Sequence, residues 1–248
     1  MITRHHLGLA FGSMLILYFP VIFADFFVLA AIASGVYIGV VLPDIQMKKP
    51  RTFRALSLAW ILVQVFKRTV LYLNIHLYQY IFGIQPESDD KRLTHSLPGV
   101  VFLTGMIACI LVIIMWAFPA PLATHYLKFF LAGIIAGLVF HFLEDTCTKK
   151  GMYPFYPFNE TYHISGSIQP CNTNDPRIRL FHVQAIAIVV AIIILYGSGR
   201  CPEYLKWPVS VSALGICLLL MIYKAEVRVV CPVPIIHKKS GVIKRGES

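Results

Sequence analysis

The chain has 248 residues, of which 57% are hydrophobic and 14% charged, and its formal net charge is +10. Soluble domains are about 45–50% apolar, so this composition excludes an ordinary soluble protein. The six cysteines form no C-x-x-C pair, which fits neither a disulfide framework nor a thiolate zinc site. Nucleic acid is not an expected partner, because basic residues gather in the cytoplasmic loops of membrane proteins. We predict one all-α membrane domain over residues 1–248.

Apolar runs predict transmembrane helices wherever they approach the roughly 20 residues that cross a bilayer. The first run has a basic start and ends near the small residue Ala24, as a cleaved signal peptide would. We favour an uncleaved first helix, because it carries a residue of the candidate site described below. Pro20 is expected to separate the first run from the second. The predicted spans lie at about 6–20, 23–42, 97–118, 124–144, 180–198 and 207–223.

The segment 53–83 is expected to be an amphipathic helical segment at the membrane interface. A straight helix of this length would measure about 45 Å, against a hydrocarbon core of about 30 Å. Lys67 and Arg68 would be costly at mid-membrane depth. An ordinary tilted span is the alternative. Helical spacing predicts one polar face made of Ser57, Gln64, Arg68, Tyr72, His76 and Gln79.

Six crossings would place both termini on one side of the membrane. That side would then receive all 22 lysines and arginines except Lys128, Arg200 and Lys206. Because positive residues mark the cytoplasmic side, we predict a multi-pass protein of the inner or plasma membrane with both termini in the cytoplasm.

Polar residues from four separate parts of the chain are expected on that same face. His141 and Asp145 are four residues apart and therefore share a helix face. Imidazole and carboxylate groups are ligands for zinc, manganese or iron, and a cation would compensate acids at the membrane edge. Glu144, beside this stripe, is interpreted as solvated. The converging residues are His5 and His6 at the start of the first helix, Asp44 after the second span, Asp90 and His95 before the third, and His141 and Asp145 at the end of the fourth.

Each of these motifs also has an ordinary structural interpretation. An H-x-x-x-D pair at a helix end is often a surface or capping pair. "THS" before an apolar run is typical of an N-cap, formed by Thr94 or Ser96. "LPD" is typical of a helix stop. It is their convergence on one membrane face that favours a functional site.

At these residues the chain resembles the YdjM-like family of bacterial and archaeal membrane-bound metal-dependent hydrolases. That family shows a His-Leu pair, then L-P-D-I-D, H-R-G-x-T-H-S, and H-x-x-x-D-x-x-T-x-x-G followed by an aromatic, proline-containing stretch. This chain has His6-Leu7, "LPDIQ" at 42–46, "DKRLTHS" at 90–96 and "HFLEDTCTKKG" at 141–151, followed by "MYPFYPF". The resemblance covers about 1–160. Residues 161–248 are read as a loop, two further spans and a basic cytoplasmic tail.

The resemblance implies a membrane relative of zinc-dependent phospholipase C, with an all-helical fold and a multi-metal phosphoesterase site. Gln46 replaces the second acid of L-P-D-I-D, which removes a charge and puts one of two possible metals in doubt. Asp90 replaces the first histidine of H-R-G-x-T-H-S but still offers an oxygen ligand, and Arg92 replaces the glycine. The implied metal ligands are His6, Asp44, His95, His141 and Asp145.

The preferred hypothesis is a membrane-bound hydrolase of a phosphoester at the cytoplasmic face, with a metal-activated water as nucleophile. The cofactor would be a divalent ion, zinc before manganese or iron, with Asp90 as an extra ligand. Asp44 or Asp90 would serve as general base. Lys91 and Arg92 would bind phosphate, although both also fit a basic cytoplasmic flank. Membrane lipids are the expected surroundings, and a lipid phosphate or another phosphoester the expected substrate.

A non-enzymatic protein is the alternative hypothesis, either a scaffold or assembly factor or a transporter with a degenerate metal site. Transporters usually place polar groups near the bilayer midplane. Here the polar groups gather at helix ends, which disfavours transport but is compatible with a scaffold.

Overall fold

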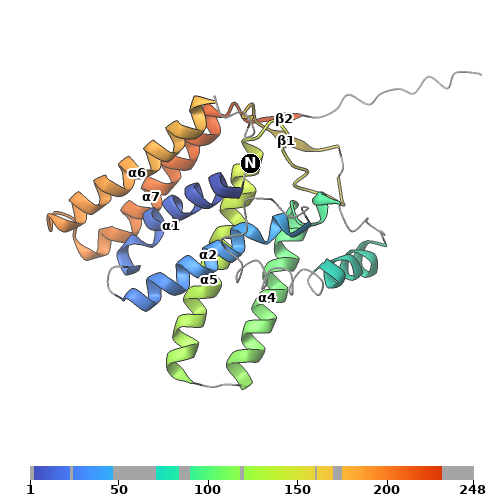
Figure 1. The fold of residues 1–248 in the computed structure, drawn as a ribbon, viewed down its shortest axis with the longest axis horizontal. Helices are drawn as coiled ribbons and strands as arrows, with labels where there is room; N and C mark the ends of the chain where they lie inside the picture. Colours follow the sequence, from blue (N-terminus) through green and yellow to red (C-terminus); the bar gives the residue numbers. More distant parts are fainter. Residues whose placement is uncertain are drawn as a thin grey trace, which may run out of the picture.

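The computed structural model describes residues 3–22, 25–46, 71–83, 90–117, 120–159, 161–169 and 175–230. Its long helices coincide with the predicted spans, which confirms the all-α membrane fold (Figure 1). They are α1 (Thr3–Ile22), α2 (Phe26–Val41), α4 (Leu97–Ala117), α5 (Pro121–Thr146), α6 (Pro176–Gly197) and α7 (Glu203–Lys224). Short 3-10 turns η1 (Pro43–Gln46) and η3 (Lys91–Leu93) follow α2 and precede α4, and β1 (His163–Ser165) pairs antiparallel with β2 (Arg228–Val230).

Helix length separates the spans into two groups. Within the described residues, α4, α6, α7 and the part of α5 from Thr124 onward are long and apolar enough to cross a membrane. α1 and α2 contribute shorter apolar helices. The 16 residues of α2 correspond to about 24 Å, less than the hydrocarbon thickness of about 30 Å. The number of six crossings is therefore approximate, and the orientation in the membrane stays a prediction.

The orientation is testable with reporter fusions. A reporter that folds only in the cytoplasm, fused after residue 248, is expected to be active, because the basic residues of the chain concentrate on that side. The same reporter inserted at Gly199, in the α6–α7 connection, is the matched control and is expected to be inactive. If the fusion at Gly199 were active and the C-terminal fusion inactive, the orientation would be the reverse of the predicted one.

The closest helix pair, α2 and α5, meets through four glycines. Gly35 and Gly39 on α2 face Gly133 and Gly137 on α5, and a Cβ added to any of them would collide with backbone of the opposite helix. At Gly39 the colliding atom is the Ile134 carbonyl oxygen. Small residues spaced four apart let membrane helices approach to backbone contact. This contact fixes the end of α2 beside the end of α5.

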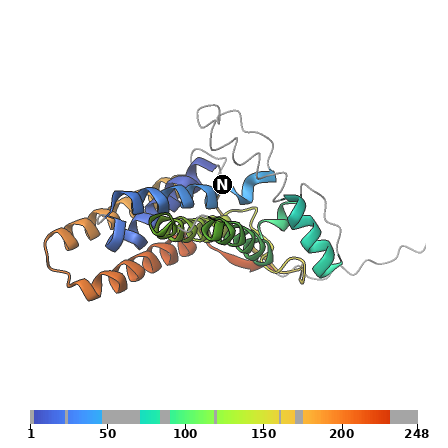
Figure 2. The same cartoon turned by 90° about the horizontal axis from the view of Figure 1, so that it is seen from below.

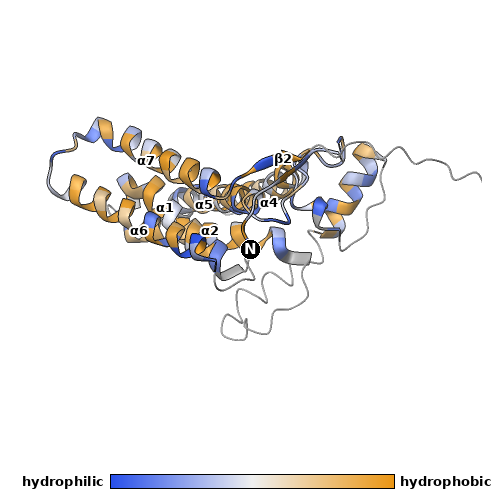
Figure 3. Cartoon of the chain, turned by 90° about the horizontal axis from the view of Figure 1, so that it is seen from above, coloured by the Kyte–Doolittle hydropathy of each residue, from blue (hydrophilic) through white to orange (hydrophobic). Residues whose placement is uncertain are grey.

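Apolar side chains fill the bundle and also cover its outside. Met14, Ile32 and Val36 are almost fully buried between α1, α2 and their neighbours. Trp116 on α4 and Leu219 on α7 are instead largely exposed. The hydropathy colouring shows long apolar stretches on the helices, with hydrophilic residues nearer their ends (Figure 3). An apolar outer surface of this kind suits contact with lipid.

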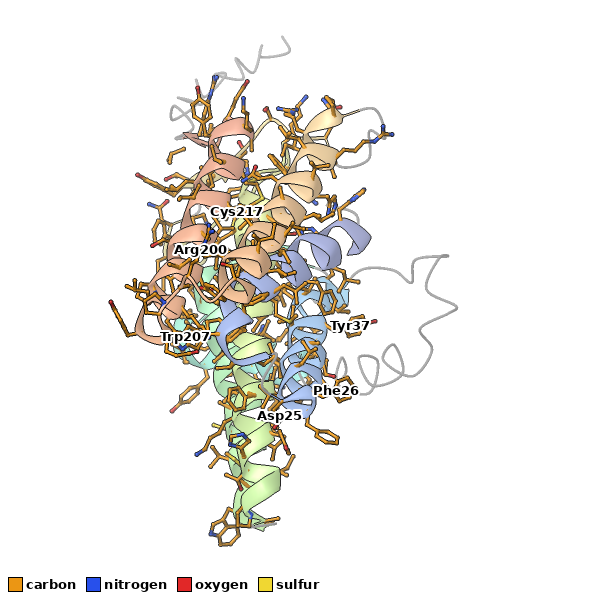
Figure 4. All side chains as sticks on the ribbon, turned by 90° about the vertical axis from the view of Figure 1, so that its left-hand side faces the viewer. Asp25, Phe26, Tyr37, Arg200, Trp207 and Cys217 are labelled. Carbon is orange, nitrogen blue, oxygen red and sulfur yellow. The ribbon has the colours of Figure 1, made fainter. Side chains whose placement is uncertain are left out.

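The start of α2, at the other end of that helix from the predicted site, has its own polar contacts. Asp25 caps α2 by accepting a hydrogen bond of 2.7 Å from the Phe27 N–H, and the Tyr126 hydroxyl on α5 donates to the same carboxylate over 3.2 Å. Trp207 on α7 makes an edge contact with Tyr18 on α1, with ring centroids 6.4 Å apart. Figure 4 labels Asp25 and Trp207 at these positions. These contacts hold the beginnings of α2, α5 and α7 in place.

Only the last part of segment 53–83 falls within the described residues, since 53–70, with Lys67 and Arg68, lie outside them. Residues 71–82 form a helix beside α4 (Figures 1 and 2). Tyr72, His76 and Gln79 are exposed, in agreement with the predicted polar face. Whether the segment crosses the membrane stays a prediction.

The opposite face of this helix docks on the "THS" turn before α4. The Asn74 side chain donates to the Leu93 carbonyl over 3.3 Å, and the Tyr78 hydroxyl lies 3.0 Å from the Ser96 hydroxyl. Burial raises the pKa of the Tyr78 phenol to about 12, so this hydroxyl stays neutral and remains a hydrogen-bond donor. The helix therefore buttresses the segment that carries His95.

Candidate metal centre

Four helix ends meet at one place in the fold. They are the start of α1, the end of α2 with η1, the start of α4 with η3, and the end of α5. The N-terminal marker lies against the last turns of α5, and the end of α2 approaches the same region (Figures 1 and 2). His6, Asp44, His95, His141 and Asp145 come together here, in two overlapping groups that could hold a metal ion.

Four pairs of donor atoms in this cluster have the spacing of neighbouring ligands around a tetrahedral metal ion. The His95 Nε2 atom lies 3.4 Å from His141 Nε2, 3.4 Å from Asp145 Oδ2 and 3.5 Å from Asp44 Oδ1. His141 Nε2 lies 3.5 Å from Asp145 Oδ2. Ligands about 2.0–2.2 Å from a tetrahedral zinc ion are about 3.3–3.6 Å apart. The four separations fall in that range.

His6 approaches the cluster from the other side of Asp145. Its Nε2 atom lies 3.3 Å from Asp145 Oδ1, so the two oxygens of Asp145 face different histidines. The His6 ring stacks on the His141 ring, with centroids 4.2 Å apart and planes at 16°. The first helix thus places a ring nitrogen of His6 beside His141 and Asp145 of α5.

The "THS" turn determines how His95 presents its ring. The Thr94 hydroxyl donates its proton to the Pro43 carbonyl over 2.9 Å and lies 3.0 Å from His95 Nδ1. Since that proton is already donated, the hydroxyl accepts from Nδ1–H, and the Nε2 atom of neutral His95 is left as a lone pair. This lone pair faces Asp44 and Asp145. Ser96 forms the expected cap, as its hydroxyl accepts from the Gly99 N–H over 3.2 Å.

The threonine and glycine that follow Asp145 build the turn that ends α5. The Thr148 hydroxyl donates to the Asp145 carbonyl over 2.9 Å and accepts from the Gly151 N–H over 3.2 Å. Gly151 has φ +59°, a left-handed conformation that glycine adopts without steric cost. Thr148 therefore supports the backbone of Asp145 through this turn.

The donor set fits a divalent cation. His6 and His141 are each 1% exposed, and Asp44 and His95 are each 8% exposed. Within the described part of the chain, the His6 Nε2 and His141 Nδ1 atoms are buried and make no hydrogen bond. Buried polar atoms nearly always have a partner, and imidazole with carboxylate is a zinc, manganese or iron donor set. Lone pairs and carboxylates gathered so closely need a positive charge between them.

Asp90 and Arg92 belong to neither group of possible ligands. Asp90 caps η3 and accepts two hydrogen bonds from the Arg92 guanidinium, with Nε at 3.0 Å and Nη2 at 2.8 Å. That guanidinium lies 4.5 Å above the centre of the Tyr156 ring. The arrangement gives no support to Asp90 as an extra ligand or general base. The side chains of Lys91 and Gln46 lie outside the described residues.

The interpretation of Glu144 as solvated is wrong. Its side chain is 2% exposed, and its Oε2 atom lies 2.7 Å from His6 Nδ1. The helical spacing of α5 alone places Glu144 beside the stripe of His141 and Asp145. The sequence does not show that α1 packs against α5 on that side and brings His6 to it.

These features define a helical membrane protein with a buried histidine–carboxylate cluster where four helix ends meet. The sequence profile of the YdjM inner membrane protein family matches residues 1–227, and the chain belongs to this family. The match extends through α6 and α7, beyond the 1–160 over which the motifs were recognised. The family supports the predicted membrane location. No curated protein and no solved structure is significantly similar to the chain.

Proposed function

We propose that the cluster binds a divalent cation, zinc in preference to manganese or iron, and that the protein uses it to hydrolyse a phosphoester at the cytoplasmic membrane face. The observation that carries the proposal is the arrangement around His95. Its Nε2 atom faces two carboxylate oxygens, at 3.4 and 3.5 Å, an arrangement that needs a positive charge between the groups, which a bound cation would supply.

The five clustered residues divide naturally into those that bind and those that assist. His95, His141 and Asp145 would hold the ion, with His6 beside the second oxygen of Asp145. A bound divalent cation supplies Lewis-acid polarisation and makes water nucleophilic near neutral pH. Asp44 directs one oxygen at His95, and its carboxylate is the candidate to accept a proton from the attacking water.

The exposure of the cluster indicates the side from which a substrate would approach. The Asp145 side chain is 14% exposed, whereas those of His6 and His141 are 1% exposed. A substrate would therefore approach past Asp145. Arg92 stays the candidate to bind its phosphate, since a guanidinium that exchanges the Asp90 carboxylate for the substrate can donate two parallel hydrogen bonds to phosphate oxygens. A lipid phosphate suits a membrane-embedded site, although a soluble phosphoester would present the same phosphate group.

Turnover by the purified, zinc-loaded protein tests this proposal. The probes are bis-p-nitrophenyl phosphate and vesicles of phosphatidylcholine with phosphatidic acid. We expect hydrolysis of at least one probe, and loss of that activity in His95→Ala. The matched control is His125→Ala, since His125 is on the first turns of α5 and belongs to neither group of possible ligands. Zinc-bound wild type without any turnover would overturn the hydrolase proposal.

Burial favours a structural cation as the second candidate function. His6, Asp44, His95 and His141 are each at most 8% exposed and come from four separate helix ends. A cation there would tie those ends together in a scaffold or assembly factor. Under this function, metal binding would stabilise the fold and turnover would be absent, so the same experiment separates the two.

A further inference from the structure

Glu144 is a buried carboxylate that contacts the cluster through His6. It is 2% exposed, and its Oε2 atom lies 2.7 Å from His6 Nδ1. The two residues are 138 positions apart in the chain. They come from α1 and α5, so their contact is part of the tertiary fold.

The contact determines which nitrogen of His6 carries the proton. When the Glu144 carboxylate is ionised it only accepts hydrogen bonds, and the Nδ1 atom is then the donor. In a neutral imidazole the other nitrogen is then a lone pair. That Nε2 atom lies 3.3 Å from Asp145 Oδ1 and makes no hydrogen bond within the described residues. The ring therefore presents a lone pair beside a carboxylate oxygen, which is the arrangement of two ligands around a cation.

The surroundings of Glu144 strengthen this hydrogen bond. Glu144 also lines a small cavity between α1, α6 and α7, whose other walls include Leu9, Phe181 and Met221. A hydrogen bond in apolar surroundings is electrostatically stronger than one in water. Stacking on His141 fixes the plane of the His6 ring, and the Glu144 contact fixes its rotation within that plane.

We propose that Glu144 is a positioning residue that accepts the Nδ1–H of His6 and so holds the His6 Nε2 atom toward Asp145 as a cation ligand. This inference rests on the proposed cation site. Metal-bound histidines usually donate their other ring N–H to a carboxylate, carbonyl or water, and changing that partner typically lowers metal affinity about 10–100-fold.

The test compares Glu144→Gln and Glu144→Leu in the full-length protein. Zinc affinity is measured by competition with a chromophoric chelator, and Co²⁺ absorption reports ligand geometry. We expect Glu144→Leu to weaken zinc binding about 10–100-fold and to alter the Co²⁺ spectrum. Glu144→Gln should restore part of the loss, because its amide oxygen still accepts from Nδ1–H. Thr146→Val is the matched control: Thr146 is buried in the same turn, but its hydroxyl donates to the Leu143 carbonyl of its own helix, over 2.6 Å.

A double-mutant cycle separates positioning from a general effect on the fold. If Glu144 acts through His6, Glu144→Leu should cause no further loss of affinity when His6 is already alanine. An equal loss in both backgrounds would overturn the inference. So would Glu144→Leu binding zinc as the wild type does.

The tautomer of His6 provides a readout that does not need metal. In the metal-free protein, ¹⁵N shifts should show the Nδ1–H form in the wild type and in Glu144→Gln, and its loss in Glu144→Leu. If the wild type bound no zinc, the proposed function would fail. An unchanged tautomer in Glu144→Leu would instead overturn the positioning role.

Discussion

Changing Asp145 to asparagine is expected to lower the zinc affinity of the purified protein by more than 100-fold while leaving it folded in detergent. The reason is charge: Asp145 directs one oxygen at His6 and the other at His95 and His141. An amide has the same shape but no negative charge to hold a cation. The effect should exceed the roughly 10–100-fold typical of residues that only support a ligand. Metal content after dialysis, measured by elemental analysis, checks the result.

Asp25→Asn is the matched control for this change. Asp25 caps α2 at the other end of that helix, and asparagine caps helices about as well as aspartate. Zinc at 100 times its dissociation constant should raise the free energy of unfolding of the wild type and of Asp25→Asn by about 2.7 kcal/mol. Their melting temperatures should rise accordingly. Zinc should not do so in Asp145→Asn. Metal content equal to that of the wild type in Asp145→Asn would contradict the site.

Replacing Gly39 with alanine is expected to destabilise the fold. The new Cβ would collide with the backbone of α5 at Ile134, and backbone cannot rotate away as a side chain can. Overpacking of this kind costs about 1–3 kcal/mol, and occasionally more. A thermal melt in detergent should show a lower midpoint. Zinc affinity should fall as well, because the shift would separate Asp44 from His141.

Gly105→Ala tests whether the effect belongs to the helix contact. Gly105 is on α4, and a Cβ there would meet no atom within 4 Å. The melting temperature of the Gly105→Ala variant should be unchanged or raised slightly, since alanine is more favourable than glycine in a helix by up to about 1 kcal/mol. A midpoint for Gly39→Ala equal to that of the wild type would mean that α2 and α5 pack less closely than the structure has them.

The local sequence pattern was sufficient to predict where the helices lie and on which side of the bundle the cluster forms. The apolar runs predicted each long helix of the described residues. The count of crossings predicted that His6, Asp44, His95 and His141 lie on one face. Contacts between helices were not predictable in this way. Gly35 and Gly39 carry no chemistry of their own, and their importance appears only when α5 lies against them. Glu144 was misread for the same reason, because its partner is in the first helix.

The structure gives no support to the metal-binding role expected for Asp90. Asp90 matched a position at which the family has a histidine, so it was expected to bind metal. Two residues later the chain has Arg92 instead of glycine, and the two side chains neutralise each other. Read together, this pair of departures indicates a salt bridge that replaces a ligand position. Compared with the family motif one position at a time, neither residue predicts this salt bridge.

The distance in sequence between His6 and Asp145 has a consequence for how the protein is made. The ribosome synthesises His6 at the start of the first helix, and Glu144 and Asp145 only at the end of α5. No nascent chain that stops before residue 145 contains the whole cluster. Zinc bound by the complete cluster would therefore report that α1, α2, α4 and α5 have all been inserted and have found one another. Loading with metal would be a late step of biogenesis, after membrane insertion of α5.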